Sequence, residues 1–210
     1  MTYKKYYAHS SNYTKGRTQG IEYIVVHYTA NDGDTAVNNG SYFSQPNRSA
    51  SAHYFVDETT ILQSVEDTDT AWHCGAKTYV HPDCRNVNSL GVEMCSERDG
   101  SGQYYINEAT VNNTAALVRE LMTQYKIPIS RVVRHYDVTG KLCPEPFVRD
   151  EKQWLNFLKK VEGGESMTTE EAIKVLVEKG VIQTGEYWLN ASKCVTYLPE
   201  LLKNMAEKVK

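Results

Sequence analysis

The chain of 210 residues is 40% hydrophobic and 23% charged, which supports one folded core with a small appendage and excludes a protein disordered throughout. Its formal net charge is −3, with 23 Lys and Arg against 26 Asp and Glu, so it lacks the basic excess that favours nucleic-acid binding. No apolar run approaches the ~18 residues that cross a bilayer, and we expect no membrane insertion.

The first predicted elements are a strand and a short helix. Residues 22–29 are β-branched and aromatic around a continuous apolar centre, which indicates a strand buried on both faces. His27 lies at the C-terminal end of this strand. Asp34 can then provide the N-cap of a helix over residues 35–43. These two elements open the body of the fold.

The rest of the body alternates between strands and helices. The pattern predicts a hairpin at residues 53–65, a strand at 89–95, a helix at 107–127, a strand at 131–135 and a helix at 154–161. The strand at 89–95 carries a carboxylate, Glu93, inside an apolar run. The strand at 131–135 ends in a second histidine, His135. Such alternation is typical of an α/β fold.

A small helical unit follows the body. The segment Gly163-Gly164-Glu165-Ser166 combines two glycines with polar residues, which predicts a linker. Beyond it, Thr168 and Glu171 form a capping box that opens one helix, and the apolar stripe from Val195 to Val209 predicts a last helix. We therefore expect a body at residues 1–162, a linker at 163–166 and a helical unit at 167–210.

Three residues with metal-binding side chains are the strongest chemical signal. His27 is joined by His135 and Cys143, which flank a loop of turn-forming residues that can aim both side chains at one point. Two imidazoles and a thiolate suit Zn²⁺, and three protein ligands leave a fourth position open for catalysis. The alternative is a buried histidine and an inert buried cysteine, and from the spacing alone this alternative is preferred.

Five motifs in a fixed order resolve that choice. They are His27-Tyr28-Thr29, Ser51-Ala52-His53-Tyr54, Asp69-Thr70-Ala71-Trp72-His73, Asn88 to Glu93, and His135 to Cys143-Pro144. Together they closely resemble the zinc-dependent N-acetylmuramoyl-L-alanine amidases of the type-2 amidase and peptidoglycan-recognition-protein superfamily, which includes many phage endolysins. The resemblance extends from about Glu22 to Lys160 and implies a central mixed β-sheet flanked by helices.

The resemblance implies cleavage of the amide between the lactyl group of N-acetylmuramic acid and L-alanine of the stem peptide. His27, His135 and Cys143 would be the zinc ligands. Glu93 would be the general base, because a carboxylate in an apolar strand is desolvated and its pKa rises. A solvent-facing Glu93 on an edge strand is the alternative. Lys141 would stabilise the oxyanion of the tetrahedral intermediate, although a solvated loop lysine is the ordinary interpretation.

Three further residues match motifs near the cleft of this family. Trp72 and His73 would bind the glycopeptide through a stacking face and a hydrogen-bonding ring, with a purely structural pair as the alternative. His53 would line the cleft or lie in the core, because a fourth protein ligand would close the metal site. Some relatives carry a tyrosine where this chain has Ala52, so a catalytic role for that tyrosine does not apply here.

Two other functions stay open at this point. The first is a non-catalytic peptidoglycan-binding protein of the same fold, although such proteins typically lack the cysteine ligand and Cys143 is present. The second is a cell-wall peptidase with Cys143 as nucleophile and His135 as its base. Removal of zinc separates the two enzymes, since a thiol peptidase would survive it.

Bacterial peptidoglycan is the expected partner. Residues 1–16 are too polar for the apolar core of a signal peptide, and five sparse cysteines fit a reducing compartment. We therefore expect a lysin that accumulates in the cytoplasm and reaches the cell wall at lysis. The unit at 167–210 is predicted to target the wall or to form a homo-oligomer, because a second binding site holds a lytic enzyme on its substrate.

Overall fold

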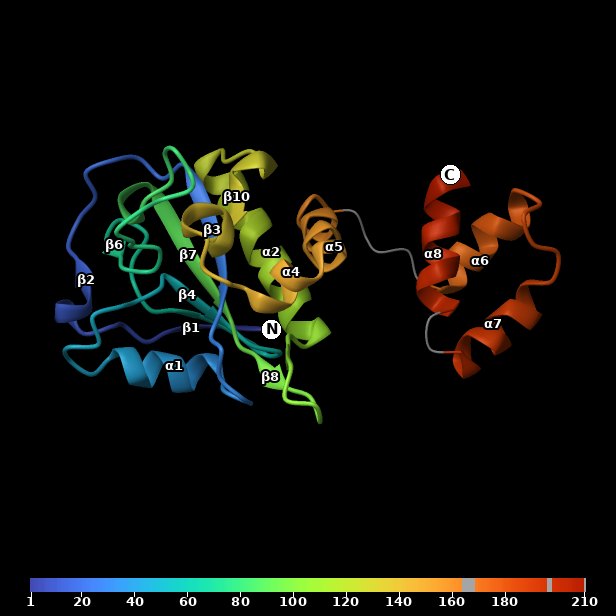
Figure 1. Cartoon of the computed structure of the whole chain (residues 1–210), viewed down its shortest axis with the longest axis horizontal. Coiled ribbons are helices and arrows are strands. Elements are labelled where there is room, and N and C mark those ends of the chain that lie inside the picture. Colours follow the sequence, from blue (N-terminus) through green and yellow to red (C-terminus); the bar gives the residue numbers. More distant parts are fainter. Residues whose placement is uncertain (164–168, 196–197, 210) are drawn as a thin grey trace. The chain divides into compact units, whose positions relative to one another are not determined.

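A computed structural model describes residues 1–163, 169–195 and 198–209 of the chain. The chain divides into two compact units, Met1–Gly163 and Gly164–Lys210, and Figure 1 labels most of their helices and strands. Of the predicted linker, residues 164–166 lie outside the described residues. In the described ranges, no helix combines the length and the apolar character that a membrane span needs.

A mixed six-stranded sheet forms the centre of the first unit. In spatial order its strands are β1 (Thr2–Lys5), β5 (Thr60–Gln63), β4 (Tyr54–Val56), β7 (Ser89–Met94), β3 (Tyr23–Tyr28) and β10 (Val132–Arg134). The strands β4 and β5 pair antiparallel, whereas the other neighbours pair parallel. The predicted α/β fold with a central mixed sheet is confirmed.

Shorter elements complete the first unit. Two antiparallel ribbons pair β2 (Tyr13–Thr14) with β6 (Thr70–Ala71) and β8 (Glu97–Arg98) with β9 (Tyr104–Tyr105). The helices are α1 (Ala36–Phe43), α2 (Glu108–Tyr125), α3 (His135–Thr139), α4 (Glu145–Arg149) and α5 (Glu151–Val161), with 3-10 turns at Ser10–Asn12, Asn86–Asn88 and Ile129–Arg131. The main core lies where α2 and α5 pack on the sheet.

The two central strands, β3 and β7, divide their side chains between two faces, because successive residues of a strand point to opposite sides. The face toward α2 and α5 carries Ile24, Val26, Leu90, Val92 and Met94. The opposite face carries Tyr23, Val25, His27, Ser89, Gly91 and Glu93. In the parallel register His27 lies directly beside Glu93. The fold thus places two of the predicted site residues next to each other at the ends of neighbouring strands.

Local predictions in the first unit need three corrections. The helix predicted at 35–43 is present, but its N-cap is Thr35, whose side chain accepts a hydrogen bond from the Asn38 backbone N–H. Asp34 instead accepts hydrogen bonds from the side chains of Thr29 and Asn39. His135 begins α3 and does not end a strand. The strand β1 was not predicted, because all four of its residues are exposed and leave no apolar alternation.

The second unit consists of α6 (Thr169–Glu178), α7 (Gly185–Cys194) and α8 (Leu198–Val209). Its core is formed by Ala172, Ile173, Leu176, Ile182, Leu202 and Ala206. The sequence pattern predicts α6 and α8 but misses α7, because none of the ten described residues of α7 is buried. Val195, expected in the last helix, is the C-cap of α7. The capping residue Thr168 lies outside the described residues.

Candidate metal centre

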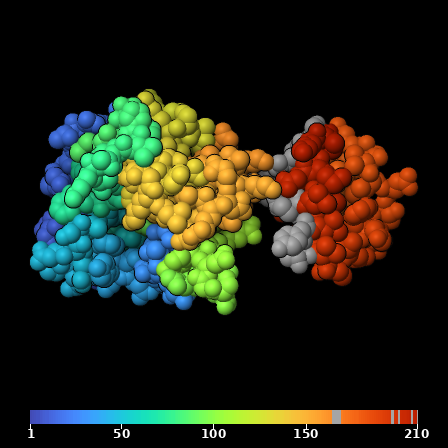
Figure 2. Space-filling model, in the orientation of Figure 1, coloured from blue at the N-terminus to red at the C-terminus, as the bar shows by residue number. Residues whose placement is uncertain are grey.

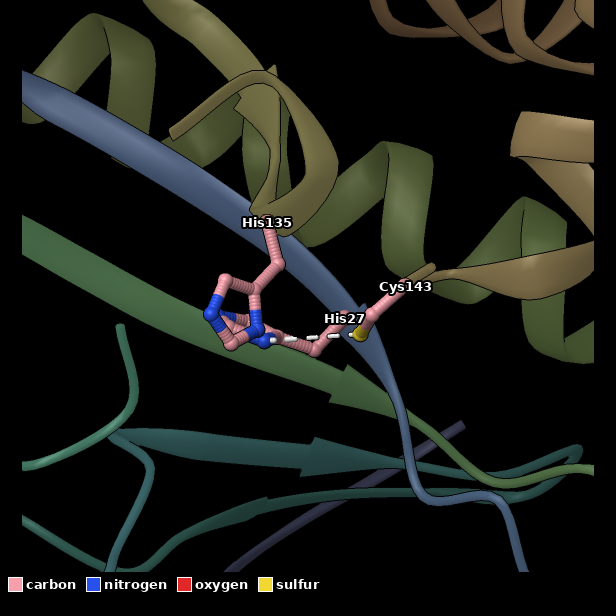
Figure 3. A group of neighbouring side chains, drawn as sticks. All are labelled: His27, His135 and Cys143. Atoms are coloured by element: carbon pink, nitrogen blue, oxygen red, sulfur yellow. Dashed lines mark hydrogen bonds between the residues drawn. The ribbon is translucent and has the colours of Figure 1, made fainter. Parts of the chain in front are cut away.

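Three side chains from distant parts of the sequence meet at the carboxyl end of the central strands. His27 lies near the end of β3, His135 starts α3 directly after β10, and Cys143 lies on the loop that follows α3. Their ligand atoms all lie within 4.8 Å of one another, and all three residues are buried. Figure 3 shows the two imidazoles beside the thiol, with His27 Nδ1 3.7 Å from Cys143 Sγ.

A tight reversal of the chain brings His135 and Cys143 together. Helix α3 ends at Gly140, which adopts φ 80°, a left-handed conformation that favours glycine. The chain then returns, and the backbone N–H of Tyr136 donates a hydrogen bond of 2.9 Å to the carbonyl of Cys143. Since β10 pairs in parallel with β3, this reversal lies directly beside His27.

The donor set fits a metal ion. Nδ1 of His135 and Oε2 of Glu93 are buried, and neither atom has a hydrogen-bond partner among the described residues. Buried polar atoms almost always have partners, so two such atoms in one place indicate a site built to bind something. Two imidazole nitrogens, a sulfur and a neighbouring carboxylate are the donors expected around Zn²⁺. In residues 1–163, 169–195 and 198–209, no second group of three such side chains lies this close.

Burial determines the charges of the cluster. Desolvation lowers the pKa of His27 well below its usual value and that of His135 to about 4, so both rings are neutral and each keeps a lone pair for a metal. Desolvation also raises the pKa of the Cys143 thiol to about 12. A thiolate in such a place needs a compensating positive charge nearby, which a metal ion would supply.

Glu93 lies within reach of the same point. Its Oε1 is 3.9 Å from Nδ1 of His27, and 19% of its side chain is exposed to the cleft. Burial raises the pKa of Glu93 to about 8, and the positive charge of Lys141 acts in the opposite direction. A carboxyl group with a pKa near neutrality can both accept and return a proton.

A cleft opens over the cluster. A cavity of about 250 Å³ is lined by the three donors together with Glu93, Trp72, His73 and Lys141. A second, wider hollow of about 630 Å³ shares Trp72, His73, His135 and Lys141 with it and extends along the segment from 75 to 86. Figure 2 shows this green segment on the same face of the first unit as the yellow segment that follows α3. The two hollows share these lining residues, and we call them together the groove.

The remaining predicted residues take different positions around this groove. Lys141 is exposed and lines both hollows. Trp72 is half-buried, and its Nε1 donates a hydrogen bond of 2.9 Å to Thr14 Oγ1. His53 is fully buried, accepts a hydrogen bond from the Gly91 N–H at 2.9 Å, and lines neither hollow. Of its two predicted positions, cleft or core, the structure gives the core.

One contact at the site was missed from the sequence. Nδ1 of His73 lies 3.0 Å from Nε2 of His27, on the side of the ring that faces away from Cys143. The motif around Trp72 and His73 predicts contact with substrate, and nothing in it indicates contact with a metal-ligand histidine 46 positions earlier. The one available signal is Gly91, an unusual residue in the middle of an apolar strand.

Comparisons with known proteins point to one family. Residues 16–146 match the family model described as N-acetylmuramoyl-L-alanine amidase. The N-acetylmuramoyl-L-alanine amidase CwlL of Bacillus licheniformis is 39% identical over 153 residues, which are 68% of this chain and 41% of that protein. The amidase CwlH of Bacillus subtilis strain 168 is 31% identical over 186 residues, 87% of this chain and 70% of that protein. The chain therefore spans less than half the length of the first of these relatives.

Solved structures give the same result. The structure of PlyL superposes with a TM-score of 0.65 at 34% identity, covering 79% of this chain and 99% of that one. The catalytic domain of XlyA superposes with a TM-score of 0.64 at 26% identity, covering 77% of this chain and 99% of that one. The resemblance carried by the five sequence motifs is confirmed.

Proposed function

The chain belongs to the N-acetylmuramoyl-L-alanine amidase family, and we propose that it hydrolyses the amide between N-acetylmuramic acid and L-alanine in bacterial peptidoglycan. The observation that carries the proposal is the meeting of His27, His135 and Cys143 in a cleft beside Glu93. Metal donors, an acid–base group and room for substrate at one point are the requirements of metal-assisted amide hydrolysis.

His27, His135 and Cys143 would hold a zinc ion. Zinc prefers nitrogen and sulfur donors, and three protein ligands leave one coordination position open. Bound there, Zn²⁺ would supply a Lewis acid of net positive charge toward the scissile carbonyl. The unpartnered Nδ1 of buried His135 supports this assignment.

Glu93 and Lys141 would handle the proton and the charge of the reaction. Glu93 takes a proton from the water that attacks the carbonyl carbon and passes it to the nitrogen of L-alanine as the carbon–nitrogen bond breaks. Burial raises the pKa of Glu93 to about 8, which favours the protonated form that returns the proton to the leaving nitrogen. The ammonium of Lys141 stabilises the negative charge that develops on the carbonyl oxygen. The products are a lactyl carboxylate and a stem peptide with a free amino terminus.

The groove would bind the glycopeptide. Trp72 lines both hollows and offers an aromatic face against which a sugar ring can stack. His73 lines the same groove, whereas His53 would support it from the core. As a phage or prophage endolysin, the protein would accumulate in the cytoplasm and act on the wall at lysis.

The second unit would hold the enzyme on the wall or join two copies of it. A separate helical unit with its own core can provide a second binding site, which raises the time spent near substrate. Deletion of residues 164–210 should then reduce co-sedimentation with purified cell walls or halve the mass in light scattering. No change in either measurement would remove both roles.

Both alternatives use less of the site. A Cys/His peptidase needs Cys143 and one histidine, which leaves the second ring and Glu93 without a role. A non-catalytic peptidoglycan-binding protein needs none of the three donors. Hydrolysis with a metal uses all four side chains.

The direct test is digestion of purified peptidoglycan, followed by detection of new L-alanine amino termini. We expect these with the wild type, loss of product on chelation and recovery on addition of zinc. Cys143→Ser should lose bound zinc and at least about 100-fold in rate, since it removes a metal ligand. Activity that survives chelation would support the thiol peptidase, and an inactive but zinc-loaded wild type would contradict the amidase.

A further inference from the structure

His73 contacts the side of the His27 ring that faces away from the other donors. Its Nδ1 lies 3.0 Å from Nε2 of His27, and the two rings meet edge to face with centroids 5.1 Å apart. Nδ1 of His27 lies 3.7 Å from Cys143 Sγ and 3.9 Å from Glu93 Oε1. One nitrogen of His27 therefore faces the donor cluster, and the other faces His73.

The direction of the hydrogen bond between the two rings follows from a chain of contacts that ends on the backbone. The hydroxyl of Ser89 donates to the carbonyl oxygen of Arg85 at 2.6 Å, which uses its one proton. Ser89 Oγ also lies 3.2 Å from Nε2 of His73, so it accepts a hydrogen bond from the N–H of that nitrogen. A neutral imidazole carries one proton. Nδ1 of His73 therefore has a lone pair and accepts from Nε2 of His27.

This hydrogen bond decides which nitrogen of His27 can bind a metal. With the proton on Nε2, the lone pair is on Nδ1, the atom that faces Cys143. Without an acceptor at Nε2, the proton can move to Nδ1, which has the carboxyl oxygen of Glu93 3.9 Å away as a nearby acceptor. A protonated nitrogen has no lone pair for a metal ion.

We propose that His73 is a positioning residue that fixes His27 in the tautomer protonated at Nε2 and so keeps Nδ1 open as the ligand atom. This role deepens the proposed function and rests on it, because its purpose is the binding of the metal. It adds to the predicted role of His73 in contact with substrate, since the ring also lines the groove.

The position of the His73 ring is built into the strand beneath it. A Cβ atom at residue 91 would lie 2.5 Å from Cγ of His73, so the ring can lie here because residue 91 is glycine. In addition, Asn86 Oδ1 accepts hydrogen bonds from the backbone N–H groups of His73 and Cys74 at 3.2 and 2.8 Å. Together these contacts hold the ring against His27.

The tautomer can be measured without any metal. Long-range ¹H–¹⁵N spectra of metal-free protein labelled in its six histidines show which ring nitrogens carry protons, and the His27→Asn variant assigns the His27 signals. We expect His27 protonated at Nε2 in the wild type and a mixture of tautomers in His73→Leu. A wild-type His27 protonated at Nδ1, or an unchanged tautomer in His73→Leu, would overturn the proposal.

Zinc affinity, measured by competition with a chromogenic chelator, is the second readout. His73→Leu fills similar space without an acceptor and should bind zinc about 10–100-fold more weakly, the usual effect of losing a partner of a metal-bound histidine. His73→Asn places Oδ1 where Nδ1 was and should stay within about threefold of the wild type. Equal affinity in His73→Leu, or equal weakness in a folded His73→Asn, would overturn the proposal.

Ser89→Ala tests the same chain of contacts without changing the ring. It removes the acceptor for Nε2 of His73, and we expect a mixed His27 tautomer with zinc affinity between those of the wild type and His73→Leu. This variant decides the matter if His73→Leu does not fold, because unchanged affinity and tautomer would contradict the proposal. A wild type that binds no zinc would instead defeat the proposed function, while the metal-free spectra would still test the tautomer.

Discussion

The two faces of β3 and β7 are made from alternate residues of the same strands, yet they differ in chemistry. On one face Ile24, Val26, Leu90 and Val92 are fully buried among apolar side chains. On the other face His27 and Glu93 are surrounded by polar groups, and Glu93 Oε2 has no partner among the described residues. A shift of one residue along the strand separates the core from the site.

The comparison shows which face sets stability and which sets activity. The apolar face depends on volume and burial, which several side chains of similar size can satisfy. The chemistry of the polar face depends on which atoms carry protons and which carry lone pairs, and one such arrangement is acceptable. Buried polar groups of this kind commonly reduce stability where they serve function. Substitutions on the apolar face should therefore lower stability and spare activity, whereas substitutions on the polar face should lower activity and spare stability. Four experiments test this.

The largest effect is expected from Glu93→Gln on the polar face. Loss of a general base should lower the rate of peptide release about 10²–10⁴-fold. The melting temperature should stay the same or rise, because an amide is less costly to bury than a desolvated carboxylate. Zinc content, measured on the same preparation, serves as the control. A stable variant with wild-type activity would remove Glu93 from the mechanism.

Leu90→Ala makes the matching change on the apolar face. Deleting a fully buried leucine side chain should lower the free energy of unfolding by about 2–5 kcal/mol, as seen in denaturant titrations. Activity per folded molecule and zinc content should not change. Leu90→Met, which keeps the volume, should cost less than about 1.5 kcal/mol. If Leu90→Ala lost zinc while keeping its stability, the separation between the two faces would be wrong.

Gly91→Ala changes the residue of β7 that lies between Leu90 and Glu93. The added methyl group would lie 2.5 Å from His73 Cγ, so the ring must shift from its position beside His27, and zinc should bind about tenfold more weakly. Gly100→Ala is the matched control, because a Cβ atom there has no neighbour within 4 Å. Equal zinc affinity in both variants would show that the ring tolerates displacement.

The smallest effect is expected outside both faces. Arg131 and Glu22 form an ion pair of 2.9 Å, and their side chains are 44% and 46% exposed. Surface pairs of this kind contribute about 0–1 kcal/mol. Glu22→Gln should therefore change neither the unfolding midpoint nor the activity measurably. A loss of more than about 1 kcal/mol in the free energy of unfolding would mean that solvent screens this ion pair less than the exposure of its side chains indicates.

The sequence predicts those parts of the structure that follow from local pattern. The apolar run around Val25 indicates a buried strand, and the alternation of strands and helices indicates the class of fold. The residues His27, His135 and Cys143 could be selected because few side chains bind zinc. Their convergence was expected from a loop of turn-forming residues, and Gly140 supplies that turn.

Other features depend on contacts that no local pattern records. The role of His73 arises from contacts with His27 and Ser89, which lie 46 positions before it and 16 after it. The strand β1 is held by pairing with β5, although its own residues are polar or exposed. Burial of His53 in the core depends on a hydrogen bond from the backbone of β7. Each of these is set by tertiary structure.

Trp72 lies where the two hollows join, half-exposed and anchored through its indole N–H to Thr14. Of the three tryptophans in the chain, Trp154 lies on α5 and is buried in the main core, and Trp188 belongs to the second unit. Replacing those two by phenylalanine would leave a single fluorophore at the groove. Its emission would then report the arrival and departure of glycan fragments in real time, without a dye.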